Sequence, residues 1–428
     1  MWSMTNGGHM YFSERHFIKQ ALPVKNGGKE MKKYLALALA VLLVLGMFAG
    51  CGQKAAGGDS GKDSGNPVVK IGVFEPASGE NGAGGKQEAL GVEYAHDKAP
   101  TVEIGGTTYD VQLVSADNES SNDKALSAAS SLVSAGVSIV LGSYGSGVSM
   151  TGGPAFEAAN IPALGITCTN QLVTEGNKYY FRICFLDPFQ GTVLGNYAMN
   201  ELGIKKAYCL SQLGDDYSTN LVQCFVDAFE KAGGSCVTDS YPKDNSDFTS
   251  YITNAKNQGC EVFFAPVSTA SAQLIINQAD SQGLGMPILA GDTWDSNVIL
   301  QAAKGKNVEV TVTTFYPEGA NAEFDNGFKE WVKADATRLA NNGGDDTVAA
   351  VSAMGYDAYF FALEALKNAG STDSAKVMEA LWKTETDGVS GHIALDQVNG
   401  DAIRNTAFVK KANTEKGVWE ALPEVTIG

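Results

Sequence analysis

Histidine is scarce in this chain, which contains only four histidines in 428 residues. Two of them precede residue 31, so His96 and His392 are the only ones left beyond that point. A serine or cysteine nucleophile would therefore have few histidine bases to activate it. Ser146 lies in Y-G-S-G-V, which does not match the G-x-S-x-G turn of hydrolases. The sequence gives no support to triad chemistry.

Patterns for metals and nucleotides are missing as well. No cluster of His, Cys, Asp or Glu has the spacing of a zinc site. The stretch G-E-N-G-A-G-G-K, residues 79–86, fits neither a Walker loop nor a dinucleotide loop. We therefore expect no cofactor and no metal. A hydrolase with two catalytic carboxylates is compatible with the composition, but no pattern supports it, and we favour binding without chemistry.

The chain has seven cysteines and no C-x-x-C pair. Six of them follow residue 160, at positions 168, 184, 209, 224, 236 and 260. Export would permit disulfides, and Cys209 and Cys236 could lie on adjacent strands. We favour free, buried thiols.

Basic residues are the minority charge, because 31 Lys and Arg stand against 48 Asp and Glu, for a net charge of -17. The acidic residues are scattered rather than clustered. A surface of this charge repels nucleic acid and anionic lipid, so we expect neither as a direct partner.

The longest apolar run is short. Residues 34–45, about twelve residues, follow Met31-Lys32-Lys33 and precede small residues and Cys51. A transmembrane anchor needs roughly 20 apolar residues. A bacterial lipoprotein signal over residues 31–51 is therefore the better interpretation.

This interpretation has consequences for the whole N-terminal region. Residues 1–30 are polar and aperiodic and end in a translated ribosome-binding pattern, so we predict that synthesis starts at Met31 and that residues 1–30 are not made. Cys51 would carry two acyl chains, which suffice for stable anchoring. Residues 52–66 would be a flexible linker. We expect the mature protein on the extracellular face of the bacterial cytoplasmic membrane, on the periplasmic side in a Gram-negative cell.

The most informative stretch of the sequence is residues 138–174. An apolar run at 139–141 gives way to a glycine and serine string at 142–149 and then to a segment of helical length. This order is typical of a buried parallel strand that leads into a helix. Ser146 lies at the junction.

A second strand, residues 162–166, ends in Thr167, Cys168 and Thr169. Two neighbouring parallel strands would thus bring hydroxyl groups to one carboxyl edge, where open α/β sheets bind ligands. The free N–H groups of a helix start attract a carboxylate or phosphate there. The alternative is that Ser146 merely caps the helix and that the threonines only form turns.

Strand and helix patterns alternate through the rest of the chain. Strands are expected at 68–74, 111–114, 179–184, 207–210, 262–265, 308–314, 392–395 and 406–410, and helices at 86–98, 125–132, 221–228, 272–279, 322–340 and 347–368, with another starting at 187. Such alternation requires crossovers and mostly parallel sheets. The predicted fold class is α/β, with two doubly wound, Rossmann-like lobes.

An ordered set of short motifs extends this prediction. The motifs are V-K-I-G-V at 69–73, P-A-S-G at 76–79, L-G-S-Y-G-S at 141–146, L-D-P-F-Q-G at 186–191, A-G-D-T-W at 290–294, Y-D-A at 356–358 and G-V-S-G-H-I-A-L-D at 388–396. Together with a lipoprotein signal, the set resembles the branched-chain amino-acid (Leu/Ile/Val) type of extracellular substrate-binding proteins. These are type I periplasmic binding proteins that serve ABC importers.

The resemblance implies a monomeric, non-catalytic receptor whose two lobes, joined by three crossing strands, close over one free amino acid. An ABC permease with its ATPases would then receive the amino acid. The crossings would fall near residues 187, 316 and 400. Lobe 1 would comprise 67–187 with 317–400, and lobe 2 would comprise 188–316 with 401–428.

The resemblance also implies the ligand contacts. Ser146, through its hydroxyl and amide, and the Thr169 amide would hold the ligand's carboxylate. The Thr167 carbonyl, the Thr169 hydroxyl and Asp292 would hold its ammonium through charge-assisted hydrogen bonds. Taken alone, Asp292 could instead cap a helix that starts near Asp295.

The side-chain pocket follows from the same resemblance. Tyr217 would cover the ligand, and Tyr144 and Trp294 would line the pocket, although such aromatic residues can also be ordinary packing residues. Gly84 and Val267 stand where relatives have aromatic rings, so Gly84 is expected to leave room for a larger ligand side chain. A sensory module of the same fold, a cell-surface hydrolase, and a binder of amides, urea or carboxylates are the rival interpretations.

Overall fold

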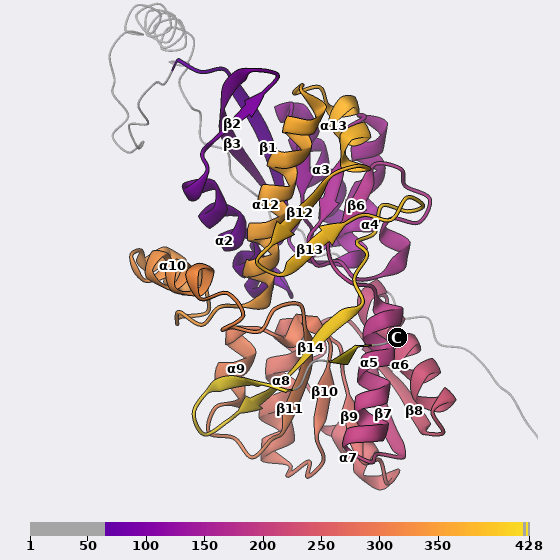
Figure 1. The fold of residues 1–428 in the computed structure, drawn as a ribbon. Coiled ribbons are helices and arrows are strands. Elements are labelled where there is room, and N and C mark those ends of the chain that lie inside the picture. The colour runs from indigo at the N-terminus through magenta and orange to yellow at the C-terminus, as the bar shows by residue number, and fades with distance from the viewer. Residues whose placement is uncertain (1–64, 423–424, 427–428) are drawn as a thin grey trace, which may run out of the picture. The chain divides into compact units, whose positions relative to one another are not determined.

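The computed structural model describes residues 65–422 and 425–426. The predicted upstream residues 1–30, the signal peptide with Cys51 and nearly all of the linker 52–66 lie outside these residues. The described residues belong to one compact unit. They form two lobes, each with a central sheet, as Figure 1 shows.

Lobe 1 is the six-stranded sheet with its covering helices. Its strands, in the order β2-β3-β1-β4-β5-β6, are β1 (Val68–Glu75), β2 (Thr101–Ile104), β3 (Thr107–Asp117), β4 (Ile139–Leu141), β5 (Ala163–Gly165) and β6 (Tyr180–Arg182). Its helices are α2 (Gly82–Lys98), α3 (Asn122–Ala135), α4 (Ser146–Ala158), α10 (Ala322–Lys333), α11 (Ala336–Asn341), α12 (Ala350–Ala369) and α13 (Ser374–Leu381). A hairpin of β12 (Glu385–Gly388) and β13 (Gly391–Ala394) lies beside α12.

Lobe 2 is the eight-stranded sheet with its helices. Its main path runs β15-β14-β11-β10-β9-β7-β8, through β7 (Lys206–Gln212), β8 (Ser235–Tyr241), β9 (Val262–Phe264), β10 (Ile288–Ala290), β11 (Val310–Thr314), β14 (Thr406–Asn413) and β15 (Val418–Ala421), and β16 (Val425–Thr426) pairs with β14. Its helices are α5 (Asp187–Asn196), which continues into the π-helical turn η2 (Tyr197–Glu201), α6 (Asp216–Lys231), α7 (Thr249–Asn257), α8 (Thr269–Ser281) and α9 (Asn297–Ala303). Strands β7 to β11 pair in parallel, and β14 returns antiparallel to β11.

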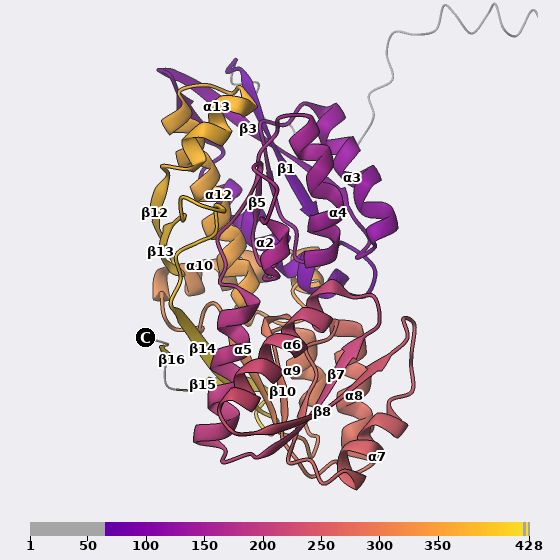
Figure 2. The same cartoon turned by 90° about the vertical axis from the view of Figure 1, so that its right-hand side faces the viewer.

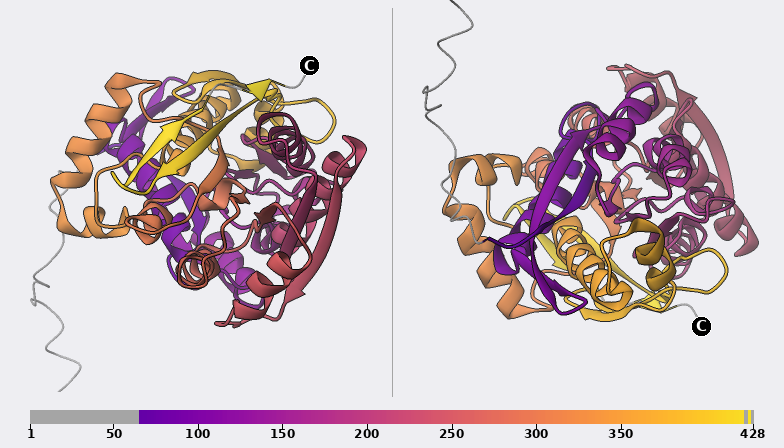
Figure 3. Two further views of the ribbon diagram at one scale, coloured as in Figure 1. Left: turned by 90° about the horizontal axis from the view of Figure 1, so that it is seen from below. Right: turned by 90° about the horizontal axis from the view of Figure 1, so that it is seen from above.

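The chain changes sheet three times. It passes from lobe 1 to lobe 2 between β6 and α5, returns between β11 and α10, and leaves again between β13 and β14 (labelled in Figure 1 and seen from the side in Figure 2). Helices cover both faces of each sheet, as the end-on views in Figure 3 show, and separate apolar cores fill the two faces. The carboxyl ends of β4 and β5 thereby lie next to each other and beside lobe 2.

Local sequence explains most of these elements. The predicted stripe Ala125, Ala128, Ala129 and Leu132 is the buried face of α3, and the helix ends at Gly136 in a left-handed conformation with φ of 71°. Helix α2 needs Gly91 to cross α12, because a Cβ there would lie 1.9 Å from the Ser352 carbonyl oxygen. This close crossing fixes the helix that carries Gly84 and Glu88 under the cleft.

The predicted α/β fold class is confirmed, with one correction and one addition in detail. The single helix expected at 322–340 is wrong, because Asp335 caps a second helix by accepting hydrogen bonds from the N–H groups of Thr337 (2.7 Å) and Arg338 (2.9 Å). The β2–β3 hairpin was not predicted. The six cysteines are free thiols, as predicted, although Cys224 and Cys236 are only half-buried. Cys209 and Cys236 do lie on adjacent strands, β7 and β8, where the register pairs Cys209 with Thr238. Within residues 65–422, no helix is long and apolar enough to cross a membrane.

Candidate functional site

The two lobes are in direct contact across the cleft. The Tyr144 hydroxyl donates to the Thr293 carbonyl over 3.1 Å, and the Ser296 hydroxyl donates to Gln87 Oε1 over 2.7 Å. At the cleft's mouth, the first N–H groups of α8 and the Thr269 hydroxyl donate to the loop that precedes α2. The cleft is therefore closed in this structure.

Ser146 is the first residue of α4 rather than its cap. The N-cap is Gly145, which has no side chain with which to accept the helix's first N–H groups. The Ser146 hydroxyl oxygen instead accepts the N–H of Asn170 over 3.2 Å and so links the two ligand loops predicted from the sequence. The uncapped N–H groups and the helix dipole make this end of α4 attractive to an anion.

The loop after β5 brings Thr167 and Thr169 next to α2 and α5. The Thr167 hydroxyl donates to Glu88, and the Thr169 carbonyl accepts the N–H of Asp187 over 2.9 Å. The Thr169 hydroxyl is buried without a well-formed hydrogen bond and lies beside the Asp187 carboxyl. Both threonines are at most 2% exposed.

Asp292 begins the short helix η3 (Asp292–Trp294) directly after β10. Its Oδ1 accepts the hydroxyl of Tyr217 over 2.9 Å and the amide of Gln190 over 2.8 Å, and its own N–H donates to Gln190 Oε1 over 2.8 Å. The cap of the following helix, α9, is Ser296, so Asp292 does not have the capping role considered above. Burial, and then the nearby Asp187 carboxyl, raise the pKa of Asp292 to about 7.

The buried charges around the cleft do not balance. The two basic residues buried in the described chain each bind a carboxylate: Arg182 binds Asp401 over 2.5 Å and Lys410 binds Asp295 over 2.9 Å. Four further buried carboxyls in or beside the cleft form no ion pair with any described residue, namely Glu75, Glu88, Asp187 and Asp292. Because unpaired buried charge is costly, burial raises the pKa of all four carboxyls, and a cation from outside the chain would stabilise their ionised forms.

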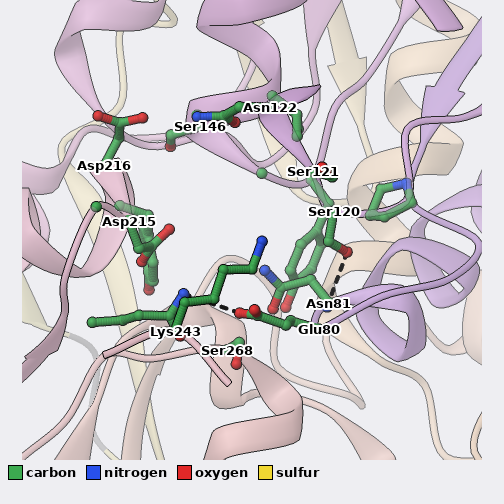
Figure 4. Close-up of a pocket in the computed structure, with 18 of the residues that line it drawn as sticks. Glu80, Asn81, Ser120, Ser121, Asn122, Ser146, Asp215, Asp216, Lys243 and Ser268 are labelled. Carbon is green, nitrogen blue, oxygen red and sulfur yellow. Dashed lines mark hydrogen bonds between the residues drawn. The ribbon is translucent and has the colours of Figure 1, made fainter. Parts of the chain in front are cut away.

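A cavity of about 200 Å³ lies between the closed lobes. Tyr144, Ser146, Tyr217 and Thr293 line it. Its remaining lining is mostly polar, and Figure 4 shows Glu80, Asn81, Ser120, Ser121, Asn122, Asp215, Asp216, Lys243 and Ser268 around the same space. Thr167, Thr169, Asp292 and Trp294 do not line the cavity but are buried nearby.

The expected space above Gly84 does not exist. A Cβ atom at Gly84 would lie 2.4 Å from the ring of Tyr144, because that ring occupies the position beside the glycine. The expectation that Gly84 leaves room for a larger ligand side chain is therefore wrong: the chain itself fills the room. Trp294 is fully buried, and its indole N–H donates to the Val267 carbonyl over 3.0 Å, so it packs inside lobe 2.

Sequence reasoning missed several residues that support this site. Arg182 donates to the carbonyl oxygens of Cys168 (2.8 Å) and Asn170 (2.6 Å) and so holds the loop of Thr169. Gln190 lies within the L-D-P-F-Q-G motif at 186–191, and this motif is the sequence signal that could have pointed to it as a partner of Asp292. Glu88 is a charged residue one turn from Gly84 on α2, and no pattern showed that this face of the helix is buried. No group of three or more His, Cys, Asp or Glu among the described residues could hold a metal ion.

Known proteins resemble the chain over most of its described length. A sequence profile of the family described as "Periplasmic binding protein" matches residues 68–416. The Leu/Ile/Val-binding protein homolog 3 of Brucella melitensis is 28% identical over 327 residues, which cover 73% of this chain and 83% of that protein. An amino acid binding protein of Pseudomonas aeruginosa is 27% identical over 366 residues, or 83% and 92% of the two chains. The crystal structure of the leucine-binding protein LivK of Thermotoga maritima is 30% identical, with a TM-score of 0.73 and coverage of 84% and 99%.

Proposed function

Because this chain belongs to the periplasmic binding protein family, a family of substrate-binding receptors rather than of enzymes, we propose that it is the receptor of an ABC importer for amino acids. It binds one free α-amino acid between its two lobes and presents the closed form to the permease. Cys51 anchors it to the membrane through two acyl chains, and residues 52–66 give it reach. The ligand-binding residues are Ser146, Thr167, Thr169, Tyr217, Asp292 and Tyr144.

The unbalanced charge at the cleft carries this proposal. Ser146 lies at an uncapped helix start that favours an anion, while Asp292 and three other buried carboxyls lack a cationic partner among the described residues. A zwitterion supplies both missing charges in one molecule. Its carboxylate would bind at Ser146 and its ammonium would bind Asp292 through charge-assisted hydrogen bonds.

Closure follows from where these groups lie. Ser146, Thr167 and Thr169 belong to lobe 1, whereas Asp292 and Tyr217 belong to lobe 2. A ligand shifts an open–closed equilibrium only by its differential affinity for the closed form. An amino acid that touches both lobes has such a differential affinity, and the permease can distinguish the closed form from the open one.

An amino acid with an apolar side chain is the first candidate ligand. The named relatives are described as a Leu/Ile/Val-binding protein homolog, an amino acid binding protein and a leucine-binding protein. The rings of Tyr144 and Tyr217 would provide the apolar contact. The polar lining of the cavity favours a second candidate ligand, an amino acid whose polar side chain reaches toward Glu80 and Ser268. A ligand-sensing role with the same site is the alternative to transport.

Thermal unfolding against the common amino acids tests the proposal. Residues 52–428 are stripped of ligand by unfolding and refolding and then heated with each of the 20 amino acids. Ligand at about a thousand times its dissociation constant adds roughly 4 kcal/mol of stability, which raises the midpoint by several degrees. We expect a small, chemically related set to produce this shift. The absence of a shift with every amino acid would contradict the proposal.

A further inference from the structure

Glu88 is a buried carboxyl of lobe 1 that the family resemblance did not assign to the site. It lies four residues after Gly84 on α2, on the same face of the helix, and is 0% exposed. Its Oε2 accepts the Thr167 hydroxyl, and its Oε1 is buried with no hydrogen-bond partner other than the Glu75 carboxyl. It forms no ion pair with a described residue.

Glu75, the last residue of β1, holds Glu88 from the other side. Glu75 Oε2 accepts the Tyr144 N–H over 2.8 Å, while its Oε1, like that of Glu88, has no other partner. The two carboxyls are hydrogen-bonded to each other. Two carboxylates have no hydrogen to share, so at least one of the pair must carry a proton. Glu75 and Glu88 together thus join the Tyr144 loop to the Thr167 loop.

The charged surroundings of Glu88 come from both lobes. On lobe 1, the ionisable groups that act on it are Glu75 of β1, Tyr144 after β4 and Cys168 after β5. From lobe 2, the Asp292 carboxyl lies close enough to act on it electrostatically. None of these groups is a cation. Two buried carboxyls from opposite lobes, Glu88 and Asp292, therefore act on each other with no cation among the groups that act on Glu88.

On the basis of the proposed amino-acid function, we propose that Glu88 is a second carboxyl of the ammonium subsite, so that the ligand's cationic group binds between Glu88 of lobe 1 and Asp292 of lobe 2. The Glu75 carboxyl keeps its proton and donates it to Glu88 as a hydrogen bond. As the ammonium enters, the O–H bond of protonated Glu88 breaks, its proton leaves to the buffer, and a hydrogen bond forms between ammonium and carboxylate. The Thr167 hydroxyl donates to the Glu88 carboxyl and so holds it near the Thr167 carbonyl, the other predicted acceptor of the ammonium.

The pKa values of Glu88 and Asp292 fit this replacement of a proton by the ligand's ammonium group. Burial raises the pKa of Glu88 to about 8, and burial raises the pKa of Asp292 to about 7. A neighbouring ammonium favours the ionised form of both groups and lowers both pKa values. Binding near neutral pH therefore releases protons, and affinity increases as the pH rises from about 6 to about 8. Each proton released contributes up to about tenfold in affinity per pH unit.

The variant Glu88→Gln tests the inference. A glutamine can accept from Thr167 and donate to Glu75, so the fold is retained, but it offers the ammonium no charge. Glu93→Gln is the matched control, because Glu93 is an exposed residue of the same helix and does not line the cavity. The probe is the common amino acid that stabilises the wild-type chain most, beginning with L-leucine. Calorimetric titration at pH 7 in phosphate and in Tris, which differ in ionisation enthalpy, gives the affinity and the number of protons released.

We expect Glu88→Gln to bind the probe about 10- to 100-fold more weakly and to release fewer protons, while Glu93→Gln matches the wild type. Wild-type affinity and proton release in Glu88→Gln would overturn the inference. Weaker binding with unchanged proton release would also overturn it, since Glu88 would then only position the loop. If no amino acid binds the wild-type chain, the proposed function and the inference fall together. If Asp292→Ala abolishes binding and Glu88→Gln does not, the inference alone falls.

Discussion

Replacing Asp292 with alanine is expected to weaken amino-acid binding by about 100-fold or more. Asp292 is 2% exposed, and we propose that it is the carboxyl that lobe 2 brings to the ammonium subsite. Removing one partner of a buried, hydrogen-bonded charge pair costs several kcal/mol of binding free energy, most of it through faster dissociation. Calorimetric titration of the wild type and the variant measures the ratio.

The fold of this variant is expected to survive. The unliganded carboxyl is buried without a cation, so its removal leaves no unpaired charge, although the Tyr217 and Gln190 hydrogen bonds are lost. Asp280→Ala is the control, since Asp280 lies in the same lobe on α8 and pairs loosely with Lys306 over 3.8 Å. It should bind like the wild type. Unchanged affinity in Asp292→Ala, with Asp280→Ala also unchanged, would contradict the two-lobe grip.

Replacing Arg182 with methionine is expected to destabilise the chain by about 3–5 kcal/mol. Arg182 is 0% exposed and donates to the Asp401 carboxylate and to three backbone carbonyl oxygens in the loop after β5. The substitution leaves Asp401 buried without its cation, which is the costly way to break a buried pair. Urea unfolding at equilibrium measures the loss.

Arg338→Met is the matched control for this prediction. Arg338 pairs with Asp97 over 3.2 Å at the surface and stacks on Trp331, and exposed pairs contribute only about 0–1 kcal/mol. Because Arg182 also holds the loop of Thr169, its variant should bind amino acids more weakly even where it is folded. If Arg182→Met were no less stable than Arg338→Met, the loop's support would have to lie elsewhere.

The strand and helix patterns of this sequence were sufficient to predict the fold class. Short apolar runs such as β4 are fully buried, and stripes such as that of α3 face the core, so burial and periodicity coincide. The junction at Ser146 and the loop of Thr169 after β5 could also be predicted, because both depend on residues close in sequence. Strand pairing then brings β4 and β5 side by side.

The residues that support the site could not be predicted from local sequence patterns. Arg182 and Asp401 are 219 residues apart, and nothing in either local sequence marks them as partners. Gly84 suggested empty space, but Tyr144, from another loop, fills it. Glu88 looks like any surface residue of an amphipathic helix until α12 and the Thr167 loop cover it. Such partners depend on the packing of distant segments rather than on local propensity.

Calorimetric titration with a matched pair of ligands tests the two-charge grip most directly. The pair is the amino acid that raises the unfolding midpoint most and the same molecule with the amine replaced by hydrogen. If Asp292 and the other unpaired carboxyls bind an ammonium, the amino acid binds and the analogue without the amine binds at least about 100-fold more weakly. Equal binding of the two molecules would contradict the account, because the cleft would then recognise a carboxylate and a side chain without any use for its buried carboxyls.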